Sequence, residues 1–270
     1  MAGSFAATLD ARMRGAALGV NDYFTLAGRA LRFVGSRPFY WRDVLLQMDR
    51  IGVGSIPIVT LTGTFTGMVL ALQSSVELQQ YGANGFLGAL VGESMVRELA
   101  PVLAGLGVAG RSGSAIAAEL GTMRVSEQID ALQTFGTDPI RKLVTPRLIA
   151  TVLMMPVVTI ILDFVSILGG MLIALGAGVS VDQYFRGMWQ MFAMNGQILG
   201  VFPKDFVYGI LKPLAFGAII ALTAAYYGLN TKGGSESVGT ATTRAVVTSS
   251  VLIFAVDFFL TQLLLVMMGV

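Results

Sequence analysis

The side chains that could do chemistry in this sequence are carboxylates, hydroxyls, amides and basic groups, because it contains no cysteine and no histidine. That composition excludes disulfide bonds, thiolate nucleophiles, imidazole bases and the usual zinc ligands. None of the lysines follows glycine in the GxxxxGK pattern of a phosphate-binding loop. Carboxylates and hydroxyls do not cluster at catalytic spacing either. We therefore predict that the chain is not an enzyme by itself and holds neither a metal nor a cofactor.

A group of polar side chains flanks two apolar runs. Glu93 and Arg97 are four residues apart and can pair on one helix face, and Glu77 and Tyr81 have the same spacing near the end of the preceding run. A lipid has a polar head and apolar tails, so its site needs a few polar groups beside an apolar wall. The alternative is that these groups only anchor helix ends at the headgroups. The predicted lipid-binding residues are Leu70, Gln73, Glu77, Leu78, Tyr81, Arg97 and Glu98.

Three further charged side chains interrupt apolar runs, namely Asp163, Lys212 and Asp257. A charge inside a membrane is costly, so each of them needs a partner. We predict that the two aspartates pair with the lysine and cancel charge within a helix bundle. The alternative is a proton relay of the kind found in secondary transporters. We favour pairing because no histidine is present to continue a relay.

The elements that position these groups are predicted to be membrane-spanning helices. Hydrophobic residues make up 54% of the chain and charged residues 13%, whereas a soluble domain has about 25% charged residues. A spanning helix needs about 20 mostly apolar residues to cross about 30 Å of hydrocarbon. We predict an all-α integral membrane protein with about five spans. They are residues 51–76, 99–110 continuing past Arg111 to 120, 148–181, 206–229 and 245–270.

Two shorter segments are predicted to lie at the membrane without crossing it. Residues 41–50 have an apolar stripe that includes Trp41 and Val44, opposite a charged face, which favours an interfacial helix before the first span. The alternative for this segment is an ordinary helix packed on the bundle. Residues 83–95 are too short to span, and we predict a re-entrant or interfacial segment there.

The distribution of basic residues predicts the orientation of the spans. The region before the first span and the connections between spans two and three and between spans four and five hold 14 of the 18 basic residues. These three regions lie on one side of a five-span protein. Because lysine and arginine are enriched in cytoplasmic segments, we predict a cytoplasmic N-terminus and an external C-terminus.

The polar connection at residues 119–147 contains a predicted amphipathic helix. Apolar residues from 125 to 135 recur at helical spacing, Gly136 can end the helix, and Asp138 with Pro139 can begin the next one. Its apolar stripe needs a protein groove, so we predict a cytoplasmic coupling helix that docks into a nucleotide-binding subunit. The alternative is that the helix folds back on its own bundle. The predicted coupling residues are Glu119, Arg124, Glu127, Ile129, Asp130, Leu132, Phe135 and Asp138.

Two long motifs carry a resemblance to a known family. They are RELAPVLAGLGVAGRSGSAIAAELGTMRVSEQIDALQTFGTDPIRKLVTPR at residues 97–147 and GGSESVGTATTRAVVTSS at residues 233–250. Both resemble the MlaE (YrbE-like) permease family of MCE-associated ABC lipid transporters, and the Arg97–Glu98 pair matches the family's pattern. The resemblance runs from about residue 41 to 270, as one permease transmembrane domain. Residues 1–40 look like a divergent cytoplasmic extension.

The resemblance implies function and partners. It implies a permease subunit that moves phospholipids between the inner and outer membranes of a bacterium and so maintains outer-membrane lipid asymmetry. The expected partners are a second copy of the chain, a cytoplasmic ABC ATPase (MlaF-like), an external, periplasmic MCE-domain protein (MlaD-like) and a STAS-domain subunit (MlaB-like), with no nucleic acid. ATP hydrolysis is then expected in the partner. The GxxxG pairs at Gly63–Gly67 and Gly88–Gly92 give weak support for dimerisation.

Two other classes of protein remain as alternatives. One is an ion- or proton-coupled secondary transporter that acts without an ATPase, in which Asp163, Asp257 and Glu98 would form the relay. The other is a membrane scaffold without transport activity. Copurification of an ATP-binding subunit distinguishes the permease from both alternatives.

Overall fold

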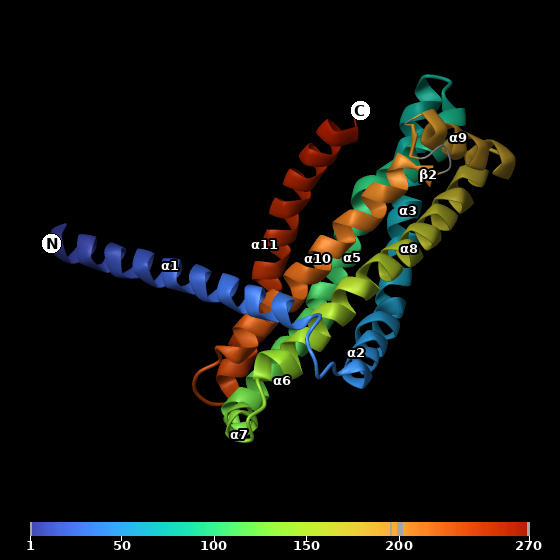
Figure 1. The fold of residues 1–270 in the computed structure, drawn as a ribbon. Helices are drawn as coiled ribbons and strands as arrows, with labels where there is room; N and C mark the ends of the chain where they lie inside the picture. Colours follow the sequence, from blue (N-terminus) through green and yellow to red (C-terminus); the bar gives the residue numbers. More distant parts are fainter. Residues whose placement is uncertain (1, 195, 199–201, 269–270) are drawn as a thin grey trace.

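Five helices long and apolar enough to cross a membrane dominate the computed structural model, which describes residues 2–194, 196–198 and 202–268 (Figure 1). The side chains are described from residue 17 onward, except those beside the gaps and at the C-terminus. The prediction of an all-α protein with five spans is therefore confirmed. The spans are Trp41–Gln80, Asn84–Val125, Ile140–Gly176, Lys204–Leu229 and Ser235–Met267.

Several spans contain short π-helical segments within one continuous helix. The first span comprises α2 (Trp41–Met48), η1 (Asp49–Val53) and α3 (Gly54–Gln80). The second comprises η2 (Asn84–Phe86), α4 (Leu87–Ser94), η3 (Met95–Leu99), α5 (Ala100–Val108), η4 (Ala109–Gly113) and α6 (Ser114–Val125). The third comprises η5 (Ile140–Val144) and α8 (Thr145–Gly176), and the fourth and fifth are α10 (Lys204–Leu229) and α11 (Ser235–Met268).

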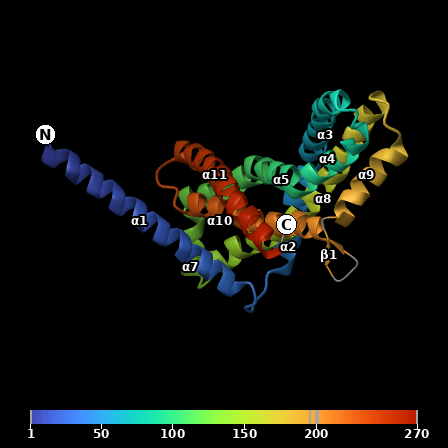
Figure 2. The same cartoon turned by 90° about the horizontal axis from the view of Figure 1, so that it is seen from above.

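The remaining elements connect the spans or precede them. The N-terminal helix α1 (Ala2–Phe33) comes before the first span, and α7 (Gln128–Thr134) lies between the second and the third. The helix α9 (Val181–Met194) and a two-residue antiparallel pair, β1 (Gln197–Ile198) with β2 (Phe202–Pro203), lie between the third and the fourth. Figures 1 and 2 show α9 at the end of the bundle opposite α7.

Glycines allow the closest helix contacts in the bundle. A methyl group at Gly67 of α3 would overlap the backbone of Ser166 in α8, and one at Gly169 of α8 would overlap the backbone of Thr64 in α3. Gly88 of α4 meets α9 in the same way. Close backbone approach of this kind is how small residues pack membrane helices. The two GxxxG pairs therefore pack helices within one chain, which corrects the suggestion that they support dimerisation.

Of the two forms predicted for residues 83–95, the re-entrant one is wrong, because these residues are the first turns of the long helix that contains the second span. Leu87 and Val91 are fully buried, so the segment is part of the core. Its charged end, at Glu93 and Arg97, looked like a boundary in the sequence. In the structure these two side chains form an ion pair, and the helix continues past them.

The predicted helix at residues 41–50 is present, but it is not a separate element. The segment continues without a break into α3, so it forms the first turns of the helix that contains the first span. Val44 and Gln47 are buried on the side that faces α8. The predicted stripe is only partly covered, because Trp41 remains exposed.

The helix α1 crosses the bundle instead of running along it, and its first half extends away from the other helices (Figures 1 and 2). Its second half packs on the bundle. The Tyr23 hydroxyl lies 3.3 Å from the Thr223 hydroxyl of α10, Arg29 donates to Asp138 at 2.8 Å, and Ala30 is fully buried. Burial raises the pKa of Tyr23, while the hydrogen bond to Thr223 acts in the opposite direction. The phenol is therefore neutral at physiological pH.

Candidate functional site

A cluster of charged side chains joins three spans inside the bundle. Lys212 is fully buried in α10, about 12 Å along the helix from its start. Its ammonium group lies 2.6 Å from a carboxylate oxygen of Glu98 in η3 and 3.0 Å from one of Asp257 in α11. It also donates to the Arg97 carbonyl at 3.0 Å. The contact with Asp257 is an ion pair without hydrogen-bond geometry.

The second half of the cluster surrounds Arg97, whose side chain is 14% exposed. The guanidinium group pairs with Glu93 at 2.8 Å and with the fully buried carboxylate of Asp205 in α10. Its central carbon lies 5.5 Å from the centre of the Tyr208 ring, within cation–π range. Arg97 thus ties η3 to the first turn of α10.

The cluster has more negative than positive charge. It contains two basic side chains and four acidic ones, and each of the six takes part in at least one ion pair of the cluster. The carboxylate of Glu98 also accepts a hydrogen bond from the Thr261 hydroxyl at 3.3 Å. Glu98 is the most exposed acid of the cluster, with 40% of its side chain accessible. Its carboxylate is therefore the one best placed to meet a ligand.

The structure does not join the two groups of predicted lipid-binding residues. Arg97 and Glu98 form ion pairs with residues of α4 and α10, and Glu98 also accepts a hydrogen bond from Thr261 of α11. Gln73, Glu77 and Tyr81 instead lie exposed on α3 and just after its end. Leu70 and Leu78 of the same helix are partly buried against the core. Within one chain, these residues form a polar and apolar face on α3 and a separate charged cluster behind it.

The predicted pairing of Lys212 is confirmed for Asp257 and wrong for Asp163. Asp163 lies in α8, where one of its carboxylate oxygens is buried without a hydrogen-bond partner in the described structure. Sequence reasoning also missed Asp205, which takes the place next to Arg97. A signal was present, because Asp205 and Lys212 are seven residues apart and so lie on the same face of α10.

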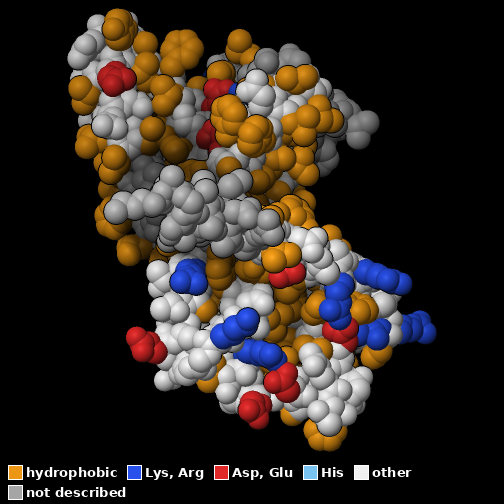
Figure 3. Space-filling model, turned by 90° about the vertical axis from the view of Figure 1, so that its left-hand side faces the viewer, with side chains coloured by type: hydrophobic (Ala, Val, Ile, Leu, Met, Phe, Trp, Pro, Cys, Tyr) orange, Lys and Arg blue, Asp and Glu red, His pale blue; other side chains and the backbone are white. Residues whose placement is uncertain are grey.

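Charged and apolar side chains separate along the molecule. Figure 3 shows most charged side chains over the lower part of the face that α1 crosses, while the upper part is largely apolar. A few acidic side chains show in a hollow between two apolar lobes of that upper part. The lower part contains the connection from α6 to η5, where coupling to a partner was predicted.

The predicted coupling helix exists as α7, and its apolar stripe is divided. Ile129 is buried and Leu132 is partly buried, so both pack on the chain's own bundle. Phe135 is 84% exposed and lies beyond the last turn of α7. The positive φ of 74° at Gly136 ends the helix, as the sequence indicated. The stripe therefore leaves one aromatic side chain uncovered.

Internal contacts hold the rest of this connection. Arg124 pairs with Asp130 at 2.5 Å, which links α6 to α7. Asp138 accepts hydrogen bonds from Arg29 at 2.8 Å and from the backbone N–H of Ile140 at 2.9 Å. The second of these bonds begins η5, as predicted for Asp138 and Pro139. Glu127 is exposed and adopts a left-handed backbone conformation with φ of 60°.

Glu119 joins the ends of three spans on the side of the bundle where α7 lies (Figure 1). Its two carboxylate oxygens accept from Arg50 of η1 at 2.9 Å and from Arg147 of α8 at 2.6 Å. Arg111 of η4 adds a hydrogen bond to the Arg50 carbonyl at 3.0 Å. Glu119 was predicted to couple to an ATPase. The structure shows that its direct contacts are within the chain, between the first, second and third spans.

The five spans, the buried ion pairs that join them and the polar connection between the second and third define a multi-pass membrane protein of the permease class. A family model described as "Permease MlaE" matches residues 44–263. The chain therefore belongs to the MlaE permease family.

Three relatives extend this comparison. A probable ABC transporter permease protein of Rickettsia prowazekii is 40% identical over 227 residues, which are 84% of each chain. The intermembrane phospholipid transport system permease protein MlaE of Haemophilus influenzae is 36% identical over 219 residues, which are 81% of each chain. The chloroplastic protein TRIGALACTOSYLDIACYLGLYCEROL 1 of Arabidopsis thaliana is 38% identical over 238 residues, which are 88% of this chain and 65% of the plant protein.

Proposed function

We propose that this chain is the membrane-spanning subunit of an ABC transporter that moves phospholipids between the inner and outer membranes of a bacterium. The observation that carries the proposal is membership of the MlaE permease family over residues 44–263. The name of the Haemophilus influenzae relative supplies the substrate class. The proposed location is the inner membrane, with the N-terminus cytoplasmic and the C-terminus periplasmic, in keeping with the basic residues of the cytoplasmic connections.

The proposed lipid site lies toward the external half of the bundle. Gln73, Glu77 and Tyr81 supply polar atoms on the exposed face of α3, and Leu70 and Leu78 supply the adjacent apolar surface. A second copy of the chain facing this surface would enclose a lipid, which is the reason for proposing a homodimer. The charged cluster around Lys212 then holds the second, fourth and fifth spans in register behind the site.

The proposed coupling site is the exposed ring of Phe135. The ring lies on a connection that the Arg124–Asp130 and Arg29–Asp138 ion pairs stabilise. A partner that displaces the ring would therefore move α6 and η5 together. From there the Glu119 bridge reaches the first and third spans. A cytoplasmic ABC ATPase is the proposed partner at this surface. An MCE-domain protein on the external side and a STAS-domain subunit complete the proposed assembly.

Copurification and reconstitution test the function together. The wild-type chain should bring down an ATP-binding subunit, and Phe135→Asp should release it, because an aspartate cannot fill an apolar groove. The matched control is Phe86→Asp, which changes an exposed phenylalanine at the opposite end of the second span. Phospholipid transfer in proteoliposomes should require the ATPase and ATP. Transfer at full rate by the permease alone, driven by a proton gradient, would replace this proposal with the secondary transporter.

A further inference from the structure

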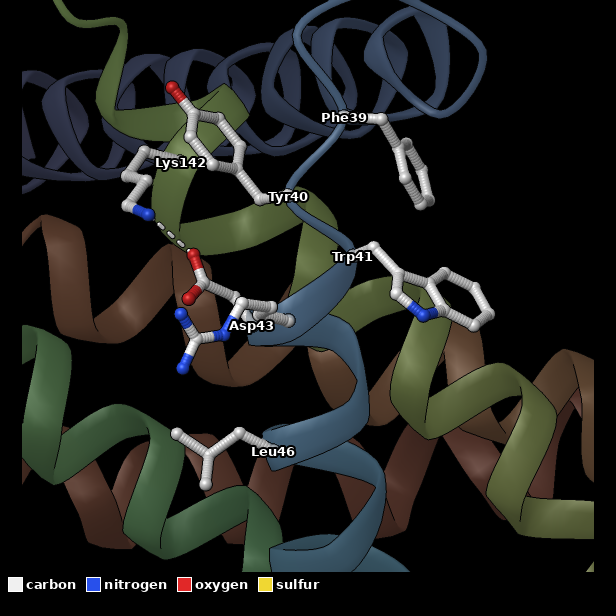
Figure 4. Close-up of a pocket in the computed structure, with 7 residues that line it drawn as sticks. Phe39, Tyr40, Trp41, Asp43, Leu46 and Lys142 are labelled. Atoms are coloured by element: carbon white, nitrogen blue, oxygen red, sulfur yellow. Dashed lines mark hydrogen bonds and ion pairs between the residues drawn. The ribbon is translucent and has the colours of Figure 1, made fainter.

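A pocket of about 570 Å³ lies where the chain passes from α1 into the first span. The segment 39–43 forms most of its wall, Leu46 lines it from the next turn of α2, and Lys142 reaches it from η5 (Figure 4). Trp41 is the first residue of the first span. The pocket therefore lies at the start of the helix that contains the first span, on the side that carries most of the basic residues and at the far end of α3 from Tyr81.

The pocket has a positively charged wall. Lys142 pairs with Asp43 at 2.5 Å, and its ammonium group stands 4.0 Å from the centre of the Tyr40 ring. This lysine is thereby held in one position at the pocket wall. Arg42 lines the same pocket and has no hydrogen bond or ion pair among the residues that the structure describes. One acid thus faces two bases, and the Arg42 charge is left for a ligand.

A second crevice adds to this positive charge. It shares Phe39 and Tyr40 with the pocket and is lined by Arg141. The guanidinium carbon of Arg141 lies 5.6 Å from the centre of the Phe33 ring, and its Nε is buried without a hydrogen-bond partner in the described structure. No acidic side chain lines this crevice. The surroundings therefore favour an anionic ligand over a zwitterionic one.

Two aromatic side chains place this positive wall at the level of the lipid headgroups. The rings of Phe39 and Trp41 lie 6.2 Å apart and are 42% and 57% exposed. In Figure 4 they project from the opposite side of the chain to Tyr40 and Lys142. An exposed tryptophan at the start of a spanning helix is typical of the membrane–water interface.

An apolar track leads from the pocket toward the hydrocarbon. Leu46 lines the pocket and is half exposed, and Val53 lies seven residues further along the same continuous helix. The π-helical segment η1 lies between them, and exposed apolar side chains continue beyond the pocket at Val53 and Ile56. An acyl chain could lie along this track while its headgroup occupies the pocket.

We propose that this pocket binds an anionic phospholipid of the cytoplasmic leaflet. The lipid phosphate would contact Arg42 and Lys142, and an acyl chain would follow Leu46 and Val53. This site is separate from the proposed transport site, which lies at the other end of α3. It does not depend on transport, so it can be tested on the permease alone.

Native mass spectrometry of the full chain tests the proposal directly. The protein is purified in detergent and mixed with equal amounts of phosphatidylglycerol and phosphatidylethanolamine. The wild type should retain phosphatidylglycerol preferentially. Arg42→Gln should reduce that retention about fivefold, since one basic residue near a membrane surface contributes about that factor. Arg42→Lys should keep most of it, because the positive charge remains.

The matched control is Arg244→Gln, which removes an exposed arginine from the same side of the bundle. Its phosphatidylglycerol retention should equal that of the wild type. Equal retention by wild type and Arg42→Gln would overturn the proposal, and so would an equal loss in both glutamine variants. Displacement of the lipid by millimolar inorganic phosphate would assign the pocket to free phosphate instead.

Discussion

The ammonium group of Lys212 lies 2.6 Å from the carboxylate of Glu98, and this contact joins the fourth span to the second deep within the bundle. Because Asp257 of the fifth span reaches the same ammonium group, one lysine holds three spans together. The stability of the bundle should therefore depend on this one positive charge.

Replacement of this lysine is expected to destabilise the protein. Lys212→Met removes the charge with little change in length and leaves Glu98 and Asp257 unpaired. We expect a loss of about 3 kcal/mol in the free energy of unfolding, the low end of the range for a broken buried pair, because Glu98 is partly exposed. Thermal unfolding in detergent measures this loss of stability. Lys232→Met, at an exposed lysine, is the control, and equal midpoints for the two variants would contradict the prediction.

The contact between Arg97 and Asp205 should matter far more than an exposed pair. Asp205→Asn keeps the shape of the side chain and weakens a fully buried ion pair, so we expect a loss of about 2–3 kcal/mol. Asp182→Asn makes the same change in the exposed Arg186–Asp182 pair and should stay within about 0.5 kcal/mol of wild type. Denaturation of both variants under the same conditions gives the comparison. A larger effect at Asp182 would show that the buried pair is not structural.

The Glu119 bridge should transmit motion from the connection between the second and third spans to the spans themselves. Glu119→Gln weakens both of its ion pairs while the side chain remains the same size. With the proposed ATPase bound, we expect ATP hydrolysis to continue while the amount of lipid moved per ATP falls several-fold. Glu236→Gln, at an exposed glutamate that forms no ion pair among the described residues, should leave that ratio unchanged. Loss of ATPase binding in Glu119→Gln would instead place this residue in the partner interface.

The backbone at Glu127 is expected to be strained, because a φ of 60° is unfavourable for a residue with a Cβ. Glu127→Gly should therefore raise the free energy of unfolding, by at most about 1 kcal/mol once the greater freedom of the unfolded chain is included. Glu127→Val should lower it, since a branched side chain tolerates this conformation poorly. Gln133→Gly, within α7, should be destabilising. If Glu127→Gly destabilises as much as Gln133→Gly, the left-handed conformation is not present in solution.

The proposed lipid site can be mapped by photocrosslinking. A photoreactive residue at Leu78 or Tyr81 should capture phospholipid from proteoliposomes that contain the assembled transporter. The same residue at Phe164 of α8, which is exposed on the side of the bundle, reports the background from surrounding lipid. Capture should be several-fold higher at the first two positions and should change when ATP is added. Equal capture at all three positions, with no response to ATP, would argue against a lipid site on α3.

The spans could be predicted from sequence because their signal is local. An uninterrupted apolar run such as residues 51–76 predicts a membrane helix by itself. Gly136 ends α7 because glycine readily adopts the positive φ observed there. Residues 41–50 and 83–95, which were predicted to be separate from the spans and are continuous with them, both contain charges that looked like helix ends. In the structure those charges have partners on other turns or other helices, such as Lys142 for Asp43.

The site was less predictable because its contacts join distant parts of the chain. Lys212 had two aspartates as candidate partners at similar depth, and only packing decides that Asp257 reaches it while Asp163 does not. The apolar stripe of α7 shows the same limit of prediction from sequence. Its period indicated which side chains share a face, but not that Ile129 would be covered by the chain itself and Phe135 left exposed.

The glycine contacts between α3 and α8 have a consequence for how such a bundle can move. Where the backbones of Gly67 and Ser166 touch, no flexible side chain lies between them to absorb sliding. The first and third spans should therefore move together as one rigid unit during a transport cycle. The fifth span has the least buried apolar stretch of the five, with 11% of it covered, and is free of such a backbone lock in the described residues. Opening and closing of the proposed lipid site should accordingly take place by movement of α11 relative to the first and third spans.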